Sequence, residues 1–284
     1  AEGGVIRFVS RAPKEGVIRA ETGAALSSHS GNSNTASFMN GKGRLKTAVS
    51  GSREASDGFQ QNSSSRKEFF SGKAALALGD GVELSVSAIR SNSLNGVPGG
   101  TSAPIGDWNG KVERKANSLS DFQRTSLGLS RAALKMPLTD DIRCSLSGEA
   151  GVNRLFFHSA WGDTLTRVLS NRALLSFSFF AKAEAGLEYE KNLLKSETYG
   201  THYTQNTGLF TQWALKPLKG LSVIPSFRFD KNVGYDNQAN PKLAVIYSPG
   251  FAWKFSAQTG RAWAAPTLAD LFNIRGPGNP DFDT

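Results

Sequence analysis

The sequence has little cysteine, little histidine and no long apolar run. Its single cysteine, Cys144, excludes an internal disulfide, and its three histidines lie far apart and match no metal-ligand spacing. No stretch approaches the ~20 consecutive apolar residues that a membrane-spanning helix needs. The opening AEGGVIRFVSR lacks the basic and apolar regions of a signal peptide, so we expect a processed product or a fragment. A membrane strand stays compatible with this composition, because such a strand alternates apolar and polar residues.

Basic residues outnumber acidic ones, which gives a formal net charge of +9. They are spread along the whole chain, whereas a nucleic-acid-binding protein concentrates them in a stripe or a helix, so we expect no nucleic-acid partner. Solvated loop side chains are the simpler interpretation, and attraction to anionic lipid or to an anionic ligand stays open. No serine or acidic residue has a histidine partner at a recognisable spacing. We therefore expect no enzyme, an esterase-type barrel included, and no cofactor or metal.

Apolar and polar residues alternate through much of the chain. In residues 221–230, LSVIPSFRFD, one set of alternate residues ends with Phe229 and the other with Asp230, so the two sets occupy opposite faces of a strand. The same division recurs in residues 82–88, 181–190 and 251–258. We count about 13 such strands. Several exceed ten residues, which is enough to cross a bilayer at a tilt.

Short turns and longer polar stretches alternate between these strands, as in antiparallel hairpins whose large loops share one end. The longest loop is expected within Ser91–Gly110, a run rich in Gly, Pro, Asn and Ser. One turn carries no Gly, Pro, Asn or Asp and is expected near Ser176–Ser178. Pro225 falls inside a strand pattern, which is tolerable only at a bulge or an edge. The longer stretches include Ser27–Asn34, Asn92–Asn117 and Ser196–Gln205.

Two architectures fit strands of this kind. A soluble sandwich or propeller would bury the apolar face in a core, and rarely needs so many long hairpins with charged opposite faces. An outer-membrane barrel turns the apolar face to lipid and the charged face to a wet lumen. The charge on the polar face favours the antiparallel transmembrane β-barrel. An odd strand count would leave open edges in lipid, so this interpretation predicts further strands after Thr284.

Three segments resemble motifs of TonB-dependent outer-membrane receptors, and they occur in that family's order. Gly3–Gly16, GGVIRFVSRAPKEG, resembles the close of the plug domain, with Arg7 where the family has asparagine. Gln205–Trp213, QNTGLFTQW, is similar to a family strand, and the last 25 residues resemble the family's extracellular loop motif. The matching positions used below are Gly3, Gly4, Val5, Ile6, Arg261, Pro266, Leu268, Leu271, Gly278, Asn279 and Pro280.

The resemblance covers essentially the whole chain, and its motif spacing is similar to that of compact cobalamin receptors. It implies an all-β fold in which residues 1–15 end the plug domain and residues 16–284 form the first part of a 22-stranded barrel. About 13 strands would be present, so the barrel would be incomplete. The resemblance also implies a monomer in the bacterial outer membrane, surrounded by outer-membrane lipid. TonB would contact a segment that precedes this chain.

The function implied by the resemblance is TonB-energised uptake of a metal chelate, either a siderophore or cobalamin. Candidate ligand contacts are aromatic and polar loop residues, which can supply apolar area and fix orientation. Arg228 and Arg261 could face the lumen and attract an anionic chelate. The simpler alternatives are an interfacial aromatic girdle for the rings and pairing with acidic residues for the arginines. The loop candidates are Asp107, Trp108, Trp161, Tyr199, His202 and Tyr235.

Two other classes stay open from the sequence. A passive porin or structural barrel would share the strands, but it has no reason to carry the plug-like segment Gly3–Gly16. A soluble β-rich surface protein would stay in the aqueous phase without detergent. In the receptor interpretation, the last residues begin as the top of a strand, continue as a helical turn over residues 267–272 and end in an extracellular loop.

Overall fold

The computed structural model describes residues 15–99, 115–160, 162–179, 182–197, 200–233, 236–250 and 253–261, together with Pro13 and Leu271. These residues form fourteen β-strands. Within the same residues, no helix is long and apolar enough to cross a membrane. The strands are β1 Ile18–Ser27, β2 Gly31–Asn40, β3 Leu45–Ser56, β4 Ser65–Gly79, β5 Val82–Gly96, β6 Phe122–Pro137, β7 Ile142–Ser159, β8 Gly162–Phe179, β9 Ala183–Ser196, β10 Gly200–Trp213, β11 Leu215–Leu218, β12 Leu221–Val233, β13 Gln238–Tyr247 and β14 Phe255–Gly260.

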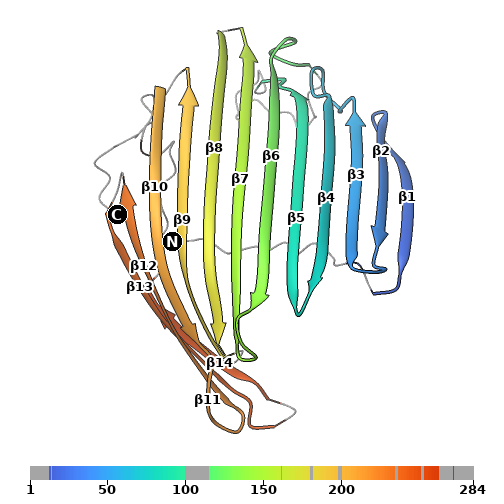
Figure 1. Cartoon of the computed structure of the whole chain (residues 1–284). Coiled ribbons are helices and arrows are strands. Elements are labelled where there is room, and N and C mark those ends of the chain that lie inside the picture. Colours follow the sequence, from blue (N-terminus) through green and yellow to red (C-terminus); the bar gives the residue numbers. More distant parts are fainter. Residues whose placement is uncertain are drawn as a thin grey trace.

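All strands belong to one antiparallel sheet in which each pairs with its neighbours in sequence (Figure 1). The exception is β11, which lies off the main path and pairs with β12. Only Ala214 separates β10 from β11, and both pair with β12, so together they act as one interrupted strand. The main path therefore has thirteen strands, which confirms the expected number.

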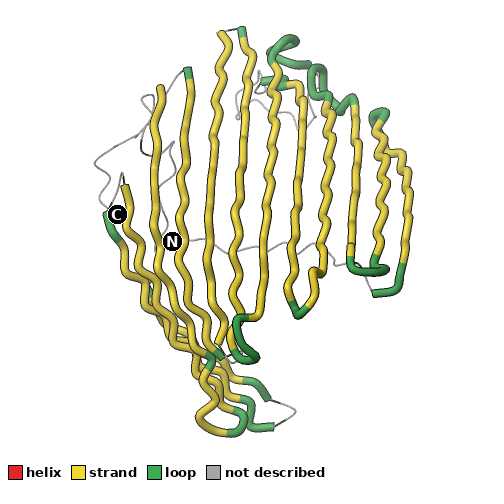
Figure 2. The backbone as a smooth tube through the Cα atoms, viewed as in Figure 1, coloured by secondary structure: helices red, strands yellow, loops and turns green. Residues whose placement is uncertain are grey.

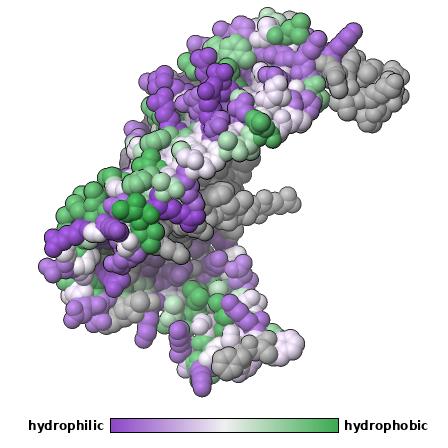
Figure 3. Space-filling view, turned by 90° about the vertical axis from the view of Figure 1, so that its right-hand side faces the viewer, coloured by the Kyte–Doolittle hydropathy of each residue, from purple (hydrophilic) through white to green (hydrophobic). Residues whose placement is uncertain are grey.

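The sheet is a single curved layer, with the loops and turns gathered at its two ends (Figure 2). Seen from the β1 side, the curvature gives a shell that is open on one side (Figure 3). We call the end with the connections 57–64 and 97–121 the loop end and the other the short-turn end. An antiparallel sheet that curves in this way and does not close is what an incomplete barrel predicts.

Several expected loops proved to be strand. β1 ends at Ser27 and β2 begins at Gly31, so Ser27–Asn34 contains only a three-residue turn in which His29 and Ser30 have positive φ. β5 likewise continues to Gly96, and β10 begins at Gly200. The expectation was wrong because these strand ends are polar on both faces. A segment that is polar on both faces shows no alternation, so its sequence resembles that of a loop.

The turn expected near Ser176–Ser178 lies instead after Phe179. β8 runs through both serines, and the Lys182 amide donates to the Phe179 carbonyl at 2.8 Å. Ser176 is buried on the polar face, which explains why polarity there does not mark a turn. Pro225 sits opposite the break between β10 and β11, so it has no partner on that side, while on its other side it pairs with Leu243 of β13. Its expected setting at an irregularity is confirmed.

One face of the sheet, here the apolar face, carries a continuous row of large apolar side chains in direct cross-strand register. Many are exposed; Leu146 and Leu187 keep 49% and 52% of their surface accessible. No second layer of described residues covers them. A soluble protein would bury such a row, so this face suits a lipid environment. The row is Leu45, Leu76, Leu84, Leu134, Leu146, Leu175, Leu187, Leu209 and Phe229.

Candidate functional site

The opposite face, here the polar face, holds every buried polar or charged side chain among the described residues. Direct pairing places Asp230 opposite Gln238 and Gly208, and Gly208 opposite Glu188, so these residues share one face. A curved sheet crowds side chains on its concave side, and this crowding explains their burial. The polar face is therefore the concave one. The buried residues are Ser147, Ser176, Glu188, Thr204, Asp230 and Gln238.

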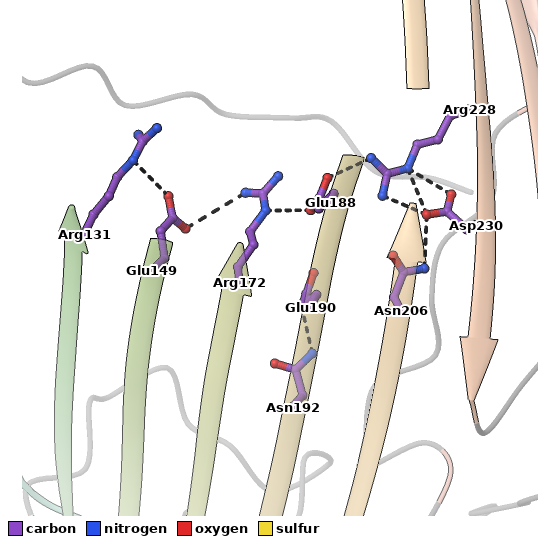
Figure 4. A network of polar contacts seen from close by, with 9 residues as sticks. All are labelled: Arg131, Glu149, Arg172, Glu188, Glu190, Asn192, Asn206, Arg228 and Asp230. Carbon is purple, nitrogen blue, oxygen red and sulfur yellow. Dashed lines mark hydrogen bonds and ion pairs between the residues drawn. The ribbon is translucent and has the colours of Figure 1, made fainter. Parts of the chain in front are cut away.

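A chain of ion pairs on this concave face joins side chains from five strands, β6 to β9 and β12 (Figure 4). We call it the ionic ladder, and its members alternate in charge. The separations are 3.4 Å for Arg131–Glu149, 4.0 Å for Glu149–Arg172, 2.5 Å for Arg172–Glu188, 2.8 Å for Glu188–Arg228 and 2.7 Å for Arg228–Asp230. Three arginines and three acids cancel, so the ladder has no net charge.

Glu188 is the centre of the ladder. Its side chain is only 6% exposed and accepts hydrogen bonds from Arg172 Nε and Arg228 Nη1. Arg228 comes from β12 and reaches Glu188 on β9 across β10. Gly208 on β10 makes this reach possible, because a Cβ there would lie 2.5 Å from Arg228 Nη2. Asn206 completes the junction by donating to Asp230 Oδ1 at 3.0 Å.

A second polar assembly, here the Asn62 clasp, lies at the loop end. Asn62 has a positive φ of 54°, and its Nδ2 donates to the carbonyls of Val97, Ser118 and Asp121 at 3.2, 3.1 and 2.8 Å. Gln60 adds a hydrogen bond from its Nε2 to the Lys115 carbonyl at 2.8 Å. The β3–β4 connection therefore holds both stems of the long β5–β6 connection.

The two arginines expected at the lumen lie near one another on the polar side. Arg228 belongs to the ionic ladder, so pairing with acids, the simpler alternative, is what the structure shows. Arg261 follows β14, and its Nη2 donates to Gln238 Oε1 at 3.2 Å. Gln238 pairs directly with Asp230, which brings the two arginines to adjacent parts of the wall.

His202 does not join them. It lies on β10 eight residues from Phe210, the cross-strand partner of Arg228, a separation of roughly 27 Å at about 3.4 Å per residue. Leu271 is helical and 1% exposed, in keeping with the helical turn expected there. The other predicted loop contacts, Asp107, Trp108, Trp161, Tyr199 and Tyr235, lie outside the described residues. So do the motif residues Gly3, Gly4, Val5, Ile6, Pro266, Leu268, Gly278, Asn279 and Pro280.

Sequence reasoning missed most of the ionic ladder. Glu188 was assigned to the polar face of its strand, but nothing near it in sequence indicates a partner 40 residues away. The signal that could have revealed the ladder is that neighbouring strands each carry a charged residue of alternating sign on the polar face, at a similar distance from the strand ends. Among the described residues, no group of three or more His, Cys, Asp or Glu side chains is placed to hold a metal ion.

Comparison with known proteins agrees with this architecture. Residues 18–284 match the model of a family described as TonB dependent receptor-like, beta-barrel. The chain belongs to this TonB-dependent receptor family. No curated protein sequence matches it. The all-β fold expected from the sequence is confirmed, and the family consists of transport receptors of the Gram-negative outer membrane.

Solved receptors of similar structure share little sequence with this one. The siderophore receptor PirA from Pseudomonas aeruginosa gives a TM-score of 0.72 at 15% identity, over 94% of this chain and 47% of PirA. The alcaligin outer-membrane receptor FauA from Bordetella pertussis gives a TM-score of 0.67 at 14% identity, over 88% of this chain and 44% of FauA. The FrpB iron transporter from Neisseria meningitidis gives a TM-score of 0.72 at 14% identity, over 91% of this chain and 49% of FrpB. At these identities the likeness shows the fold, and this chain spans under half of each receptor.

Proposed function

We propose that this receptor takes up a metal chelate of the siderophore type across the bacterial outer membrane, with energy from TonB. The observation that carries the proposal is the match of residues 18–284 to the TonB-dependent receptor barrel. The names of the similar structures support the substrate class, since they refer to siderophores and iron. Cobalamin, the other candidate from the sequence, has no such support.

The two faces of the sheet suit this role. The apolar face offers exposed leucines to lipid, while the concave face is polar and suits a water-filled lumen. The Asn62 clasp holds the stems of the longest connection at the loop end, where an incoming ligand would meet the receptor first. This proposal keeps residues 1–15 as the end of the plug and residues 16–284 as barrel.

The ionic ladder acts in this scheme as part of the wall and not as a binding site for the chelate. Each of its guanidinium groups already faces a carboxylate within 4.0 Å. An anionic chelate would have to displace one of these carboxylates, which costs the hydrogen bonds of a largely buried group. A neutral wall lets a charged ligand pass without trapping it.

Uptake of labelled iron tests the proposal. The full-length protein is expressed in cells that lack their own iron-chelate receptors, and accumulation of radiolabelled iron is followed with several ferric siderophores. We expect accumulation that requires TonB and stops when a protonophore collapses the inner-membrane gradient. Accumulation that is unaffected by loss of TonB would instead show a passive porin. Uptake of labelled cobalamin with no uptake of any ferric siderophore would refute the substrate class.

A further inference from the structure

Toward the loop end, the apolar face becomes basic on four consecutive strands. Arg154 on β7 pairs directly with Arg167 on β8, which pairs directly with Lys195 on β9. Arg124 on β6 lies on the same face, two residues nearer the loop end and opposite Phe156. We call these four residues the outer basic cluster. Like charges in direct cross-strand register repel one another, so a negatively charged partner would stabilise this arrangement.

The described part of the chain does not supply that partner. None of the four cations has a carboxylate within 4.0 Å among the described residues. On this face of strands β6 to β10, Asp163 is the one acidic residue among those described. Its Oδ1 lies 2.5 Å from His158 Nδ1, in a hydrogen bond. Arg167 Nε is shielded from solvent and has no hydrogen-bond partner in the described structure.

The ionic ladder provides the internal contrast. On the concave face of the same strands β6 to β9, Arg131 and Arg172 each meet a glutamate. The fold therefore can pair arginines on these strands, as it does for Arg131 and Arg172 on the concave face. The described residues bring no carboxylate within 4.0 Å of Arg154 and Arg167 on the outer face, so an anionic ligand would meet these two cations without an acidic partner.

Immediately below the outer basic cluster, the same face becomes apolar. Val152, Leu169 and Leu193 form a direct cross-strand row two residues closer to the short-turn end, about 7 Å along the strands. Beside this row, small residues such as Ala132 and Ala150 line an open hollow of about 760 Å³. A partner of the cluster thus meets anion-binding groups and apolar surface together.

We propose that the outer basic cluster binds the phosphate groups of a lipid in the membrane leaflet at the loop end, with acyl chains along the apolar row and hollow. Guanidinium groups match phosphate oxygens bidentately, and lysine adds a point charge. Basic residues at the border of an apolar band are the expected pattern for contact with anionic headgroups. The inference rests on the barrel's position in a membrane and is independent of the chelate that it transports.

Native mass spectrometry of the full-length protein in an uncharged detergent tests the inference. The probes are bisphosphorylated lipid A and the dephosphorylated lipid with the same acyl chains. We expect one tightly retained lipid A and weak retention of the dephosphorylated form. The triple variant Arg154→Gln, Arg167→Gln, Lys195→Gln should bind lipid A roughly a hundredfold more weakly, since each cation near an anionic surface contributes about a fivefold factor.

Two further triple variants make the test specific. Lys46→Gln, Lys67→Gln and Lys73→Gln remove the same charge from the polar face and should leave lipid A binding unchanged. A charge-conserving set, Arg154→Lys, Arg167→Lys and Lys195→Arg, should retain most of it, which guards against a folding artefact. Equal weakening by both neutralising sets, or equal retention of both lipids, overturns the proposal. Full displacement of lipid A by inorganic phosphate alone would assign the cluster to free phosphate and would also overturn it.

Discussion

Replacing Glu188 by glutamine tests whether the ionic ladder stabilises the barrel wall. The substitution removes the charge that accepts hydrogen bonds from Arg172 and Arg228 at 2.5 and 2.8 Å. Breaking a buried ion pair costs roughly 3–5 kcal/mol. Here both arginines keep part of their surface in water, at 43% and 35% exposure, and recover some hydration. We therefore expect a loss of about 2–3 kcal/mol.

Glu190→Gln is the matched control. Glu190 lies on the same strand and face as Glu188, but it accepts a hydrogen bond from the neutral side chain of Asn192, at 2.8 Å. We expect it to cost less than about 1 kcal/mol. The assay is urea unfolding of the full-length protein in lipid vesicles, followed by tryptophan fluorescence. Equal unfolding free energies for the two variants, within about 0.5 kcal/mol, would refute a stabilising role for the ladder.

Three further predictions use other parts of the wall. Gly208→Val should displace Arg228 from Glu188, so its loss of unfolding free energy in the same assay should not add to that of Glu188→Gln. Gly148→Val is the control and should lose little, because a Cβ there would meet nothing within 4 Å. Asn62→Ala should speed amide hydrogen exchange in the stems of the β5–β6 connection. Gln61→Ala removes one hydrogen bond, from the Ala116 amide at 3.4 Å, and should leave that exchange unchanged. Unchanged exchange in both variants would refute a role of the Asn62 clasp in holding the stems. Leu187→Arg on the apolar face should lower the unfolding free energy in vesicles by about 2–4 kcal/mol, and Leu127→Arg on the polar face by under about 1 kcal/mol. Equal losses would contradict a lipid-facing leucine row.

The alternation of residues predicts the faces of the strands well. In β12, Phe227 and Phe229 were expected on one face and Arg228 and Asp230 on the other, and the structure places them so. The period of a strand is two, so a side chain's face follows from its neighbours alone. The number of strands and the antiparallel arrangement also follow from local patterns, because hairpin connections leave few other topologies.

Strand ends and cross-strand partners were not predictable in the same way. Near Ser27–Asn34, both faces of the strands are polar, so the alternation fades before the strand ends. The turn after Phe179 contains no residue that marks a turn. The partnership of Glu188 with Arg228 depends on the registers of β9, β10 and β12 together, and an error of one residue in any register would move one partner to the other face.

Register also decides what an arginine does in this wall. Arg131 and Arg154 lie on neighbouring strands, and each follows the local alternation, yet one faces Glu149 and the other faces Arg167. On the concave face, Arg131 is balanced within the wall by Glu149. A charge at the border of the lipid band can be balanced by the membrane itself. The same residue type therefore closes the wall on one face and leaves a cation available to lipid phosphate on the other.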